Sequence, residues 1–287
     1  MKDNLINWLL FVVLSVIWGS SFLLMKIGIT VLQPFEVASL RILSAGIVLL
    51  PFAFRGFKDL PRNKLPYVIL SGSLGSFLPA FLFCTAETKL DSALTGMLNS
   101  LTPLCAVIIG VLFFKMKTSF RKLLGILIGL VGLFFMISPN GNLHLNNTPS
   151  LLMVIAATIL YAVNVNMVSR HLKGLIPIKI ASVAFACHII PCLSILIYTG
   201  YFSKPLLEKN YLKATFASCS LGIIGTAFAT VLFYRLVSRS NALFAAMVTY
   251  GIPFVAAAWG ILYGEQVTPI ELGCLAIILA GVYLANN

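Results

Sequence analysis

The chain has 287 residues, of which 60% are apolar and only 10% are charged, and its formal net charge is +12. Soluble domains average roughly 45–50% apolar and about 25% charged residues, so the composition excludes a soluble protein and indicates one that resides in a lipid bilayer. The basic residues are scattered over short loops beside apolar helices, without stacking aromatic residues, which excludes a nucleic-acid partner and favours the positive-inside pattern of membrane proteins.

Apolar segments follow one another along the chain, most of them near the ~20 residues that cross the hydrocarbon core as a helix. We predict ten such helices. The first half contributes Asn7–Thr30, Pro34–Phe54, Leu65–Ala86, Ser92–Phe114 and Lys122–Ile137. The second half contributes Ser150–Ser169, Pro177–Tyr198, Leu212–Leu236, Ala242–Tyr263 and Ile270–Ala285.

Short motifs of the first half recur 143 to 150 residues later in the second half. The matches include Pro34–Ser39 with Pro177–Ser182, Ser73–Gly75 with Ser220–Gly222, and Pro103 with Pro253. Because each copy has an odd number of helices, the second copy enters the membrane from the opposite face. We therefore expect two inverted five-helix repeats, residues 5–137 and 149–285, in an all-α membrane protein, an architecture common in secondary transporters.

The distribution of Lys and Arg predicts the orientation, because cytoplasmic loops hold the excess of these residues. With the N-terminus inside, fourteen of them lie at the inner face and five at the outer face, with Arg41 set aside as intramembrane. Both termini are therefore expected in the cytoplasm. This fits a multi-pass protein of the cytoplasmic membrane.

Polar and aromatic residues gather halfway along the first helix and its counterpart, the sixth. The first helix carries Trp18, Ser20 and Ser21, and the sixth carries Tyr161 and Asn164. Polar groups at the bilayer midplane need a partner helix or a wet cavity. An amide has four hydrogen-bonding valences, which favours a cavity for Asn164, whereas the serines could equally bond to their own helix and the aromatic residues could equally pack in the core.

A second pair of helices brings polar groups to similar depth just before a proline. Asn99 and Ser100 precede Pro103 in the fourth helix, and Thr249 and Tyr250 precede Pro253 in the ninth. Proline removes the donor for a carbonyl one turn earlier and weakens the helix there. Together with the first and sixth helices, these residues form the predicted substrate-binding set, with Asn99 favoured for the cavity and Ser100 equally compatible with helix packing.

Two basic residues lie within or near the membrane in the first half, namely Arg41 and Lys26. We expect them either to extend to the outer headgroups or to attract an anionic group of a solute from an outer vestibule. Their charge could be balanced by Glu36 or Glu87.

Several other residue types are expected to be structural. The six cysteines lie in apolar segments without CxxC spacing, which predicts core residues and neither a disulfide, a metal nor a cofactor. His188 is either a packed, hydrogen-bonded side chain or part of a proton path. Small residues in the fifth and tenth helices permit close packing and allow a homodimer through these helices. Thr268 and Glu271 are spaced as a capping box.

The motifs as a set resemble EamA-type carriers of the drug/metabolite transporter superfamily. They are the WGSSF stretch Trp18–Phe22, Pro34 with Arg41, Gly264 with Glu265, and the closing stretch Ala280–Leu284. The resemblance covers the whole chain and implies a ten-helix bundle, with both termini inside, around a path for a small metabolite. Two positions depart from the family pattern: Met116 replaces an expected acid and Cys274 replaces a glycine.

These observations lead to one main hypothesis and one alternative. The chain is expected to be a secondary carrier that moves a small amphipathic metabolite, an amino acid or its derivative, by alternating access, with export implied by the resemblance. The alternative is an uncoupled channel or facilitator for small solutes. An enzyme is not expected, because the sequence has neither GxSxG, HExxH nor paired carboxylates at bilayer depth.

Overall fold

The computed structural model describes residues 2–114, 119–137, 147–240 and 242–286, and the part of the chain that it describes is helical with short connections. Within these residues, eight helical segments are long and apolar enough to cross a membrane. They are Leu5–Gly28, Pro34–Asp59, Arg62–Ala86, Ser92–Phe114, Thr148–His171, Pro177–Tyr198, Lys209–Arg239 and Phe244–Leu262. Leu123–Met136 and Pro269–Leu284 are shorter apolar helices. The chain is a multi-pass membrane protein.

The helices fall in the order that the sequence predicts, and all ten apolar segments are helical. The first half comprises α1 (Lys2–Gly28), α2 (Pro34–Asp59), α3 (Leu65–Gly72), α4 (Leu78–Ala86), α5 (Ser92–Asn99), α6 (Thr102–Phe114) and α7 (Phe120–Ile137). The second half comprises α8 (Thr148–His171), α9 (Pro177–Ala186), α10 (Ile189–Tyr198), α11 (Lys209–Ser220), α12 (Ala229–Arg239), α13 (Ala242–Ala246), α14 (Ile252–Leu262) and α15 (Pro269–Asn286).

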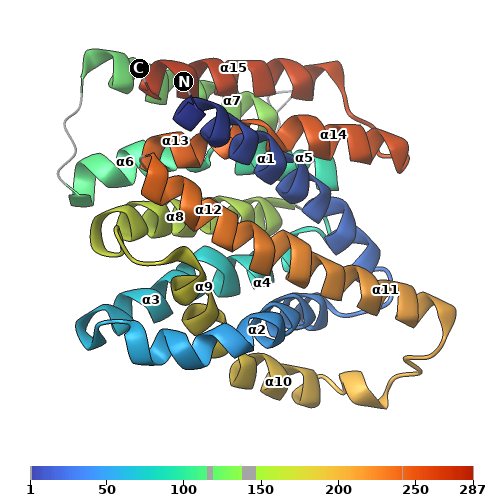
Figure 1. Cartoon of the computed structure of the whole chain (residues 1–287). Helices are drawn as coiled ribbons and strands as arrows, with labels where there is room; N and C mark the ends of the chain where they lie inside the picture. The colour runs from blue at the N-terminus through green and yellow to red at the C-terminus, as the bar shows by residue number, and fades with distance from the viewer. Residues whose placement is uncertain (1, 115–118, 138–146, 241, 287) are drawn as a thin grey trace.

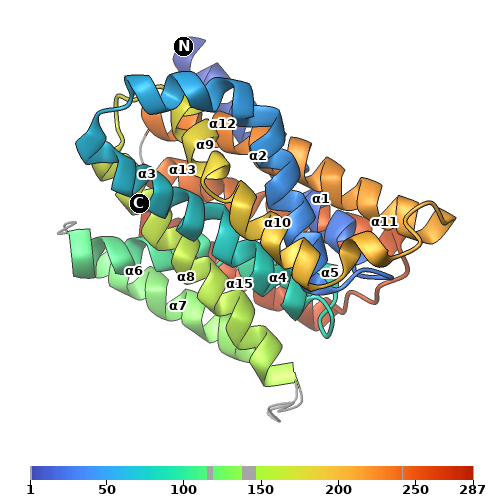
Figure 2. The same cartoon turned by 90° about the horizontal axis from the view of Figure 1, so that it is seen from below.

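The helices of the two halves interleave, as Figure 1 shows. α1 packs beside α11, α12 and α14, α2 lies against α9 and α10, and α4 and α6 lie against α8. α7 and α15 lie side by side along one edge of the bundle. The start of α1 and the end of α15 lie at the same end of the bundle, on the left in both views (Figures 1 and 2).

The fourth and ninth predicted helices are interrupted just before their prolines. α5 ends at Asn99 and α6 begins at Thr102, and a 3₁₀ turn, Met247–Tyr250, precedes α14. The Asn99 carbonyl has lost the backbone donor that Pro103 cannot supply, and it instead accepts a hydrogen bond from Thr102 Oγ1 at 2.8 Å. The prolines therefore open the helices where the sequence predicts.

The repeated triplet at Ser73 and Ser220 marks another interruption in each half. Ser73–Phe77 separates α3 from α4, Leu221–Phe228 separates α11 from α12, and both form wide π-helical turns. π-Helical turns are rare and are frequent at functional sites. Each copy therefore carries one such turn at the same repeated motif.

α7 and α15 make contact through glycines. Gly132 of α7 faces Ile278 and the Cys274 carbonyl of α15, and Gly281 of α15 faces the backbone of Gly129. The small residues therefore serve close packing within the chain, and the homodimer through these helices stays a prediction.

The first turn of α15 contains the capping box that the sequence predicts. Glu271 Oε2 accepts hydrogen bonds from Thr268 N at 2.7 Å and Thr268 Oγ1 at 3.0 Å, and Glu271 N donates to Thr268 Oγ1 at 3.2 Å. Glu271 is thus a helix-capping residue, as expected.

Gly222→Ala is expected to lower the melting temperature of the protein, whereas Gly273→Ala is not. A Cβ at Gly222 would collide with the Ser44 hydroxyl and the Arg41 carbonyl of α2, whereas nothing lies within 4 Å of that position at Gly273. Overpacking of this kind costs about 1–3 kcal/mol. Thermal unfolding of the two variants in detergent checks the difference, and equal melting temperatures would contradict it.

Candidate functional site

A cavity lies between the two halves of the chain and contains about 830 Å³ of space not filled by atoms, including the part open to solvent. Both halves line it. The first half contributes Trp18, Ser21, Phe22, Met25, Arg41, Gly75, Ser76, Phe83, Asn99 and Thr102. The second half contributes Tyr161, Asn164, Val165, Gly225, Thr226, Thr230, Phe233, Tyr234, Ala246, Thr249 and Ile252.

The wall formed by α1 is fixed by bonds to the second half. Trp18 Nε1 donates to the Gly225 carbonyl in the π-helical turn at 3.0 Å, and the Trp18 ring packs against Phe233 with 5.2 Å between centroids. Ser21 lines the cavity as well, while its hydroxyl donates to Ile17 O in its own helix at 2.9 Å. The α1 wall therefore presents an immobilised aromatic face and one hydroxyl.

α8 supplies the opposite wall with the other aromatic and amide residues that the sequence singles out. Tyr161 stacks on Phe83 with 5.8 Å between ring centroids. Asn164 is 5% exposed and interacts with the Tyr234 hydroxyl, but its Oδ1 has no hydrogen-bond partner among the described residues. The Oδ1 atom itself is buried, so it is a vacant acceptor that a solute would meet after the amide turns toward the cavity.

Six residues of the predicted substrate-binding set line the cavity together. They are Trp18, Ser21, Asn99, Tyr161, Asn164 and Thr249.

The other three predicted binding residues lie outside the lining. Ser20 Oγ donates to Val16 O and accepts from Trp259 Nε1 at 2.9 Å, and Ser100 Oγ donates to Met97 O. Tyr250 is half-buried at the end of its 3₁₀ turn. Ser20 and Ser100 thus make the helix-packing bonds that the sequence left open as the alternative.

The two predicted vestibule charges lie in different places. Arg41 lines the cavity and is 7% exposed, with Nε donating to Thr226 Oγ1 at 2.7 Å and Nη1 lying 3.7 Å from Met25 Sδ. Lys26 instead reaches the connection between α4 and α5. Two acids were expected to balance these charges, Glu36 and Glu87. Glu36 forms an ion pair with Lys204 at 2.6 Å, so Glu87 is the remaining candidate.

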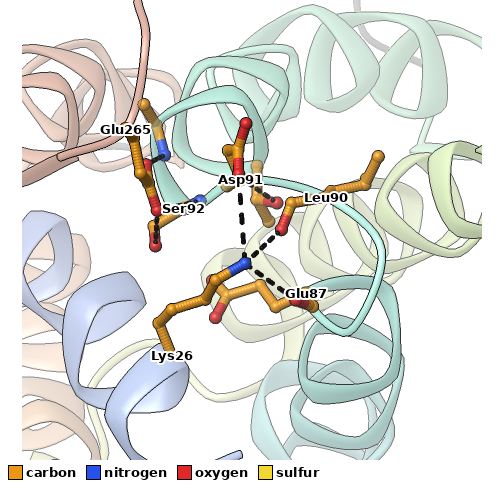
Figure 3. A network of polar contacts seen from close by, with 8 residues as sticks. Lys26, Glu87, Leu90, Asp91, Ser92 and Glu265 are labelled. Atoms are coloured by element: carbon orange, nitrogen blue, oxygen red, sulfur yellow. Dashed lines mark hydrogen bonds and ion pairs between the residues drawn. The ribbon is translucent and has the colours of Figure 1, made fainter. Parts of the chain in front are cut away.

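A cluster of polar contacts holds the α4–α5 connection (Figure 3). Lys26 Nζ donates to the Leu90 carbonyl at 3.0 Å and the Glu87 carbonyl at 3.3 Å, and it lies 4.0 Å from Asp91 Oδ1. Glu265, from the α14–α15 connection, accepts hydrogen bonds from Ser92 N, Ser92 Oγ and Ala93 N at 2.7–3.0 Å. We call these contacts the α4–α5 clamp. The bonds of Glu265 tie the first half to the second, and those of Lys26 hold the connection within the first half.

The clamp adjoins one end of the cavity. Phe22 and Phe83 line the cavity and pack edge to face with 5.7 Å between centroids, and Lys26 and Glu87 follow them by one helical turn each. The motif glutamate Glu265 caps α5 through backbone amides at the positive end of the helix. The corresponding position of the first copy, Met116, lies outside the described residues.

Glu87 lies just beyond the third membrane segment and is fully buried, and neither carboxyl oxygen has a hydrogen-bond partner among the described residues. Burial raises the pKa of Glu87 well above its usual range; Lys26 and Arg41 oppose this change and Glu265 adds to it. The neutral acid is therefore favoured, because burial without hydrogen bonds disfavours the ionised form.

Glu87→Gln is expected to make the protein more stable than wild type at neutral and alkaline pH and about equally stable near pH 4. An acid with a raised folded pKa makes its full contribution to stability below its unfolded pKa, about 4.3, and loses it as pH rises through the folded pKa. Glutamine stays neutral and removes this loss. Melting temperatures measured from pH 4.5 to 8 check the divergence, and parallel curves would contradict it. Glu36→Gln should instead destabilise, because it breaks the buried bond to Lys204.

Sequence reasoning missed the cavity residues of the π-helical turns, which include Gly75, Ser76, Gly225 and Thr226. A signal was present, because the Ser-Leu-Gly triplet at Ser73 and Ser220 is one of the repeated motifs. Only the structure shows that this triplet marks the π-helical turns in the cavity wall. Without a Cβ, Gly75 leaves room for the Asn164 side chain and Gly225 for the Ser21 hydroxyl.

Histidine and cysteine take structural places in the described part of the chain. His188 Nδ1 contacts the Ala184 carbonyl at 2.7 Å and Nε2 contacts Ser73 Oγ at 3.0 Å, and His188 is not in the cavity lining. The six cysteines are free and half-buried or buried. No cluster of three or more potential metal ligands occurs among the described residues.

Comparison with known proteins gives matches along the whole chain. The model of the EamA-like transporter family matches residues 6–138 and again residues 148–287. An uncharacterized transporter of Archaeoglobus fulgidus is 23% identical over 279 residues, which is 97% of this chain and 98% of the relative. The uncharacterized inner membrane transporter YedA of Escherichia coli K12 is 28% identical, covering 95% of this chain and 88% of the relative.

Two further similarities concern a named activity and the fold. A Salmonella typhimurium protein named a probable amino-acid metabolite efflux pump is 25% identical, covering 94% of this chain and 91% of the relative. A solved crystal structure with 16% identity superposes with a TM-score of 0.64, covering 99% of this chain and 96% of that chain. The latter similarity shows a shared fold.

Proposed function

The chain belongs to the EamA-like transporter family, and on this premise we propose that it is a secondary carrier that exports a small amphipathic metabolite, an amino acid or its derivative. The observation that carries the proposal is the cavity between the two halves, which combines aromatic faces, an amide, hydroxyls and one guanidinium. This mixture suits a solute with an apolar body and a polar head. The Salmonella relative named an amino-acid metabolite efflux pump supports the solute class and the direction.

The proposed mechanism is alternating access, in which the two halves rock around the cavity. Inverted halves supply two conformations of similar energy by exchanging roles. The interleaved contacts between the halves and the position of the cavity between them support this mechanism. The α4–α5 clamp would then close one mouth of the cavity, because it ties the halves together one turn beyond Phe22 and Phe83.

The proposed topology has ten membrane helices in two inverted repeats, with both termini in the cytoplasm, and the proposed location is the cytoplasmic membrane. The placement of α1 and α15 at one end of the bundle supports an even number of crossings (Figure 1). The name of the Escherichia coli relative supports an inner membrane. Tag-accessibility mapping tests the topology: Asn63 and Arg170 should be labelled from the same side, and labelling from opposite sides would refute it.

Counterflow in proteoliposomes tests carrier function against the alternative of an uncoupled channel. A thermal-shift screen of amino acids and their acylated and deaminated derivatives first selects a probe, because a ligand that binds the native form raises its stability. Preloaded unlabelled probe should then accelerate entry of the radiolabelled probe. Entry that is independent of preloading would indicate a channel, a pathway compatible with the absence of a carboxylate from the described cavity lining.

A further inference from the structure

Arg41 is the one charged residue in the described lining of the cavity, and it has no counter-ion there. Arg41 is 7% exposed, and its guanidinium contacts the hydroxyls of Thr226 and Tyr161 and a thioether, Met25 Sδ. No carboxylate lies within 4.0 Å of it among the described residues. A buried charge without a counter-ion is energetically costly. An anion that enters the cavity would supply the missing counter-ion and form an ion pair with Arg41.

The neighbouring acids do not neutralise Arg41. Glu36 forms an ion pair with Lys204. The other basic residue of the first half, Lys26, donates to the carbonyls of Glu87 and Leu90. The charge of Arg41 favours ionisation of Glu87, but the burial of Glu87 without hydrogen-bond partners has the larger effect and favours the neutral acid. The cavity therefore carries a net positive charge that the protein leaves unbalanced.

The charge has the geometry of a carboxylate receptor. A guanidinium is planar and presents parallel N–H donors that match the two oxygens of a carboxylate. Nε is held by Thr226, which fixes the direction of the group. An ammonium group, in contrast, would meet no carboxylate in the described lining, so a free amino group would lose its hydration without gaining a counter-ion.

Asn164 adds a second requirement. Its Oδ1 is buried without a donor, and its side chain is held in place against Gly75. An amide N–H or a hydroxyl of the solute would satisfy this oxygen once the side-chain amide turns its oxygen toward the cavity. Trp18 and Tyr161, each fixed by its own contacts, offer flat apolar surfaces to the rest of the solute.

We propose, on the basis of the carrier function proposed above, that the solute is an amphipathic organic anion: a carboxylate without a free ammonium group, such as an N-acylated or deaminated amino acid. Its carboxylate binds the Arg41 guanidinium. Its N–H or O–H group donates to Asn164 Oδ1, and its apolar body lies against Trp18 and Tyr161. Zwitterionic amino acids and organic cations bind less tightly, because the described lining offers no counter-charge for an ammonium group.

A charge series built on one phenyl side chain tests the inference. The probes are N-acetylphenylalanine, 3-phenylpropionate, phenylalanine and phenylalaninamide, measured by thermal shift on purified protein and by competition for counterflow. We expect the two anions to bind about tenfold or more tightly than the zwitterion, and the cation to bind least. N-acetylphenylalanine should exceed 3-phenylpropionate, because it alone of the two carries an N–H donor.

Two variants of Arg41 connect the preference to this residue. Arg41→Gln should remove the advantage of the anions over phenylalanine. Arg41→Lys keeps the positive charge but loses the parallel N–H donors of the guanidinium, so it should retain part of that advantage. Melting temperatures without solute show whether each variant is folded. If Arg41→Gln is too unstable to purify, the charge ranking on wild-type protein decides by itself.

The outcomes separate the inference from the carrier proposal. Equal binding of anion and zwitterion, or an anion preference that survives in folded Arg41→Gln, would overturn the inference while leaving the carrier intact. The same holds if none of the four probes binds but a zwitterionic or cationic metabolite drives counterflow. Channel-like entry with a clear anion preference would instead overturn the carrier proposal and leave the anion site standing.

Discussion

Asn164→Leu is expected to lower transport a few-fold to about tenfold without reducing the amount of folded protein. Leucine has the same number of side-chain heavy atoms and the same branching as asparagine but offers no acceptor to the solute. Asn164 Oδ1 accepts no hydrogen bond in the described part of the protein. Removing this oxygen therefore leaves no buried donor of the protein without its acceptor. A hydrogen bond to a solute contributes about 0.5–1.5 kcal/mol, and more when one partner is charged, so its loss corresponds to a few-fold to tenfold or greater decrease. Counterflow with the selected probe measures the effect.

Asn166 provides a matched control two residues along the same helix. Its Nδ2 donates to the Ala106 carbonyl at 3.0 Å and the Ala162 carbonyl at 2.9 Å, and Asn166 does not line the cavity. Asn166→Leu should therefore lower the melting temperature, with a loss of about 1–3 kcal/mol for unsatisfied buried groups. Transport per folded molecule should change little. If both variants lost transport and stability together, Asn164 would be a packing residue like its neighbour.

The helices themselves could be predicted from the sequence, because span length and apolarity are set by the bilayer rather than by tertiary contacts. Pro34 and Pro177 mark the starts of α2 and α9 as expected. The prolines Pro103 and Pro253 also located the interruptions, because proline acts on the backbone of its own helix. Local chemistry decided each of these features.

The candidate site could be predicted only in part, because depth in the membrane does not determine which way a side chain faces. Ser20 and Ser21 are neighbours at the same depth, yet Ser21 lines the cavity and Ser20 contacts Trp259. Thr226 and Tyr234 were missed, since their place depends on a π-helical turn that shifts the register of the helix. Facing direction is set by helix packing, which the pattern of one chain does not contain.

Glu265→Ala is expected to shift the protein toward a state in which the cavity opens at the α4–α5 clamp. The substitution removes an acceptor from Ser92 N, Ser92 Oγ and Ala93 N at the start of α5. These groups are buried in the clamped state, where each unsatisfied donor costs about 1–3 kcal/mol. In an open state, water could satisfy them. The difference of at least about 1.4 kcal/mol corresponds to a tenfold change in the equilibrium between the two states.

Cys84 is a native reporter of this change. Its side chain is fully buried. In the sequence it directly follows Phe83, which lines the cavity, and precedes the clamp residue Glu87. Glu265→Ala should increase the rate of Cys84 labelling by a maleimide about tenfold or more, with Cys84→Ser in the same background to subtract labelling of the other cysteines.

Glu271→Ala is the matched control: Glu271, in the first turn of α15, also caps a helix, but its side-chain bonds among the described residues go to Thr268 within its own half. It should lower stability slightly and leave Cys84 labelling unchanged. Glu265 lies in the α14–α15 connection and Glu271 in the first turn that follows it, and each variant removes one negative charge, so a difference between them isolates the bonds between the halves. Unchanged labelling in Glu265→Ala, together with a lower melting temperature, would mean that the glutamate only stabilises α5 and that the clamp does not control access to the cavity.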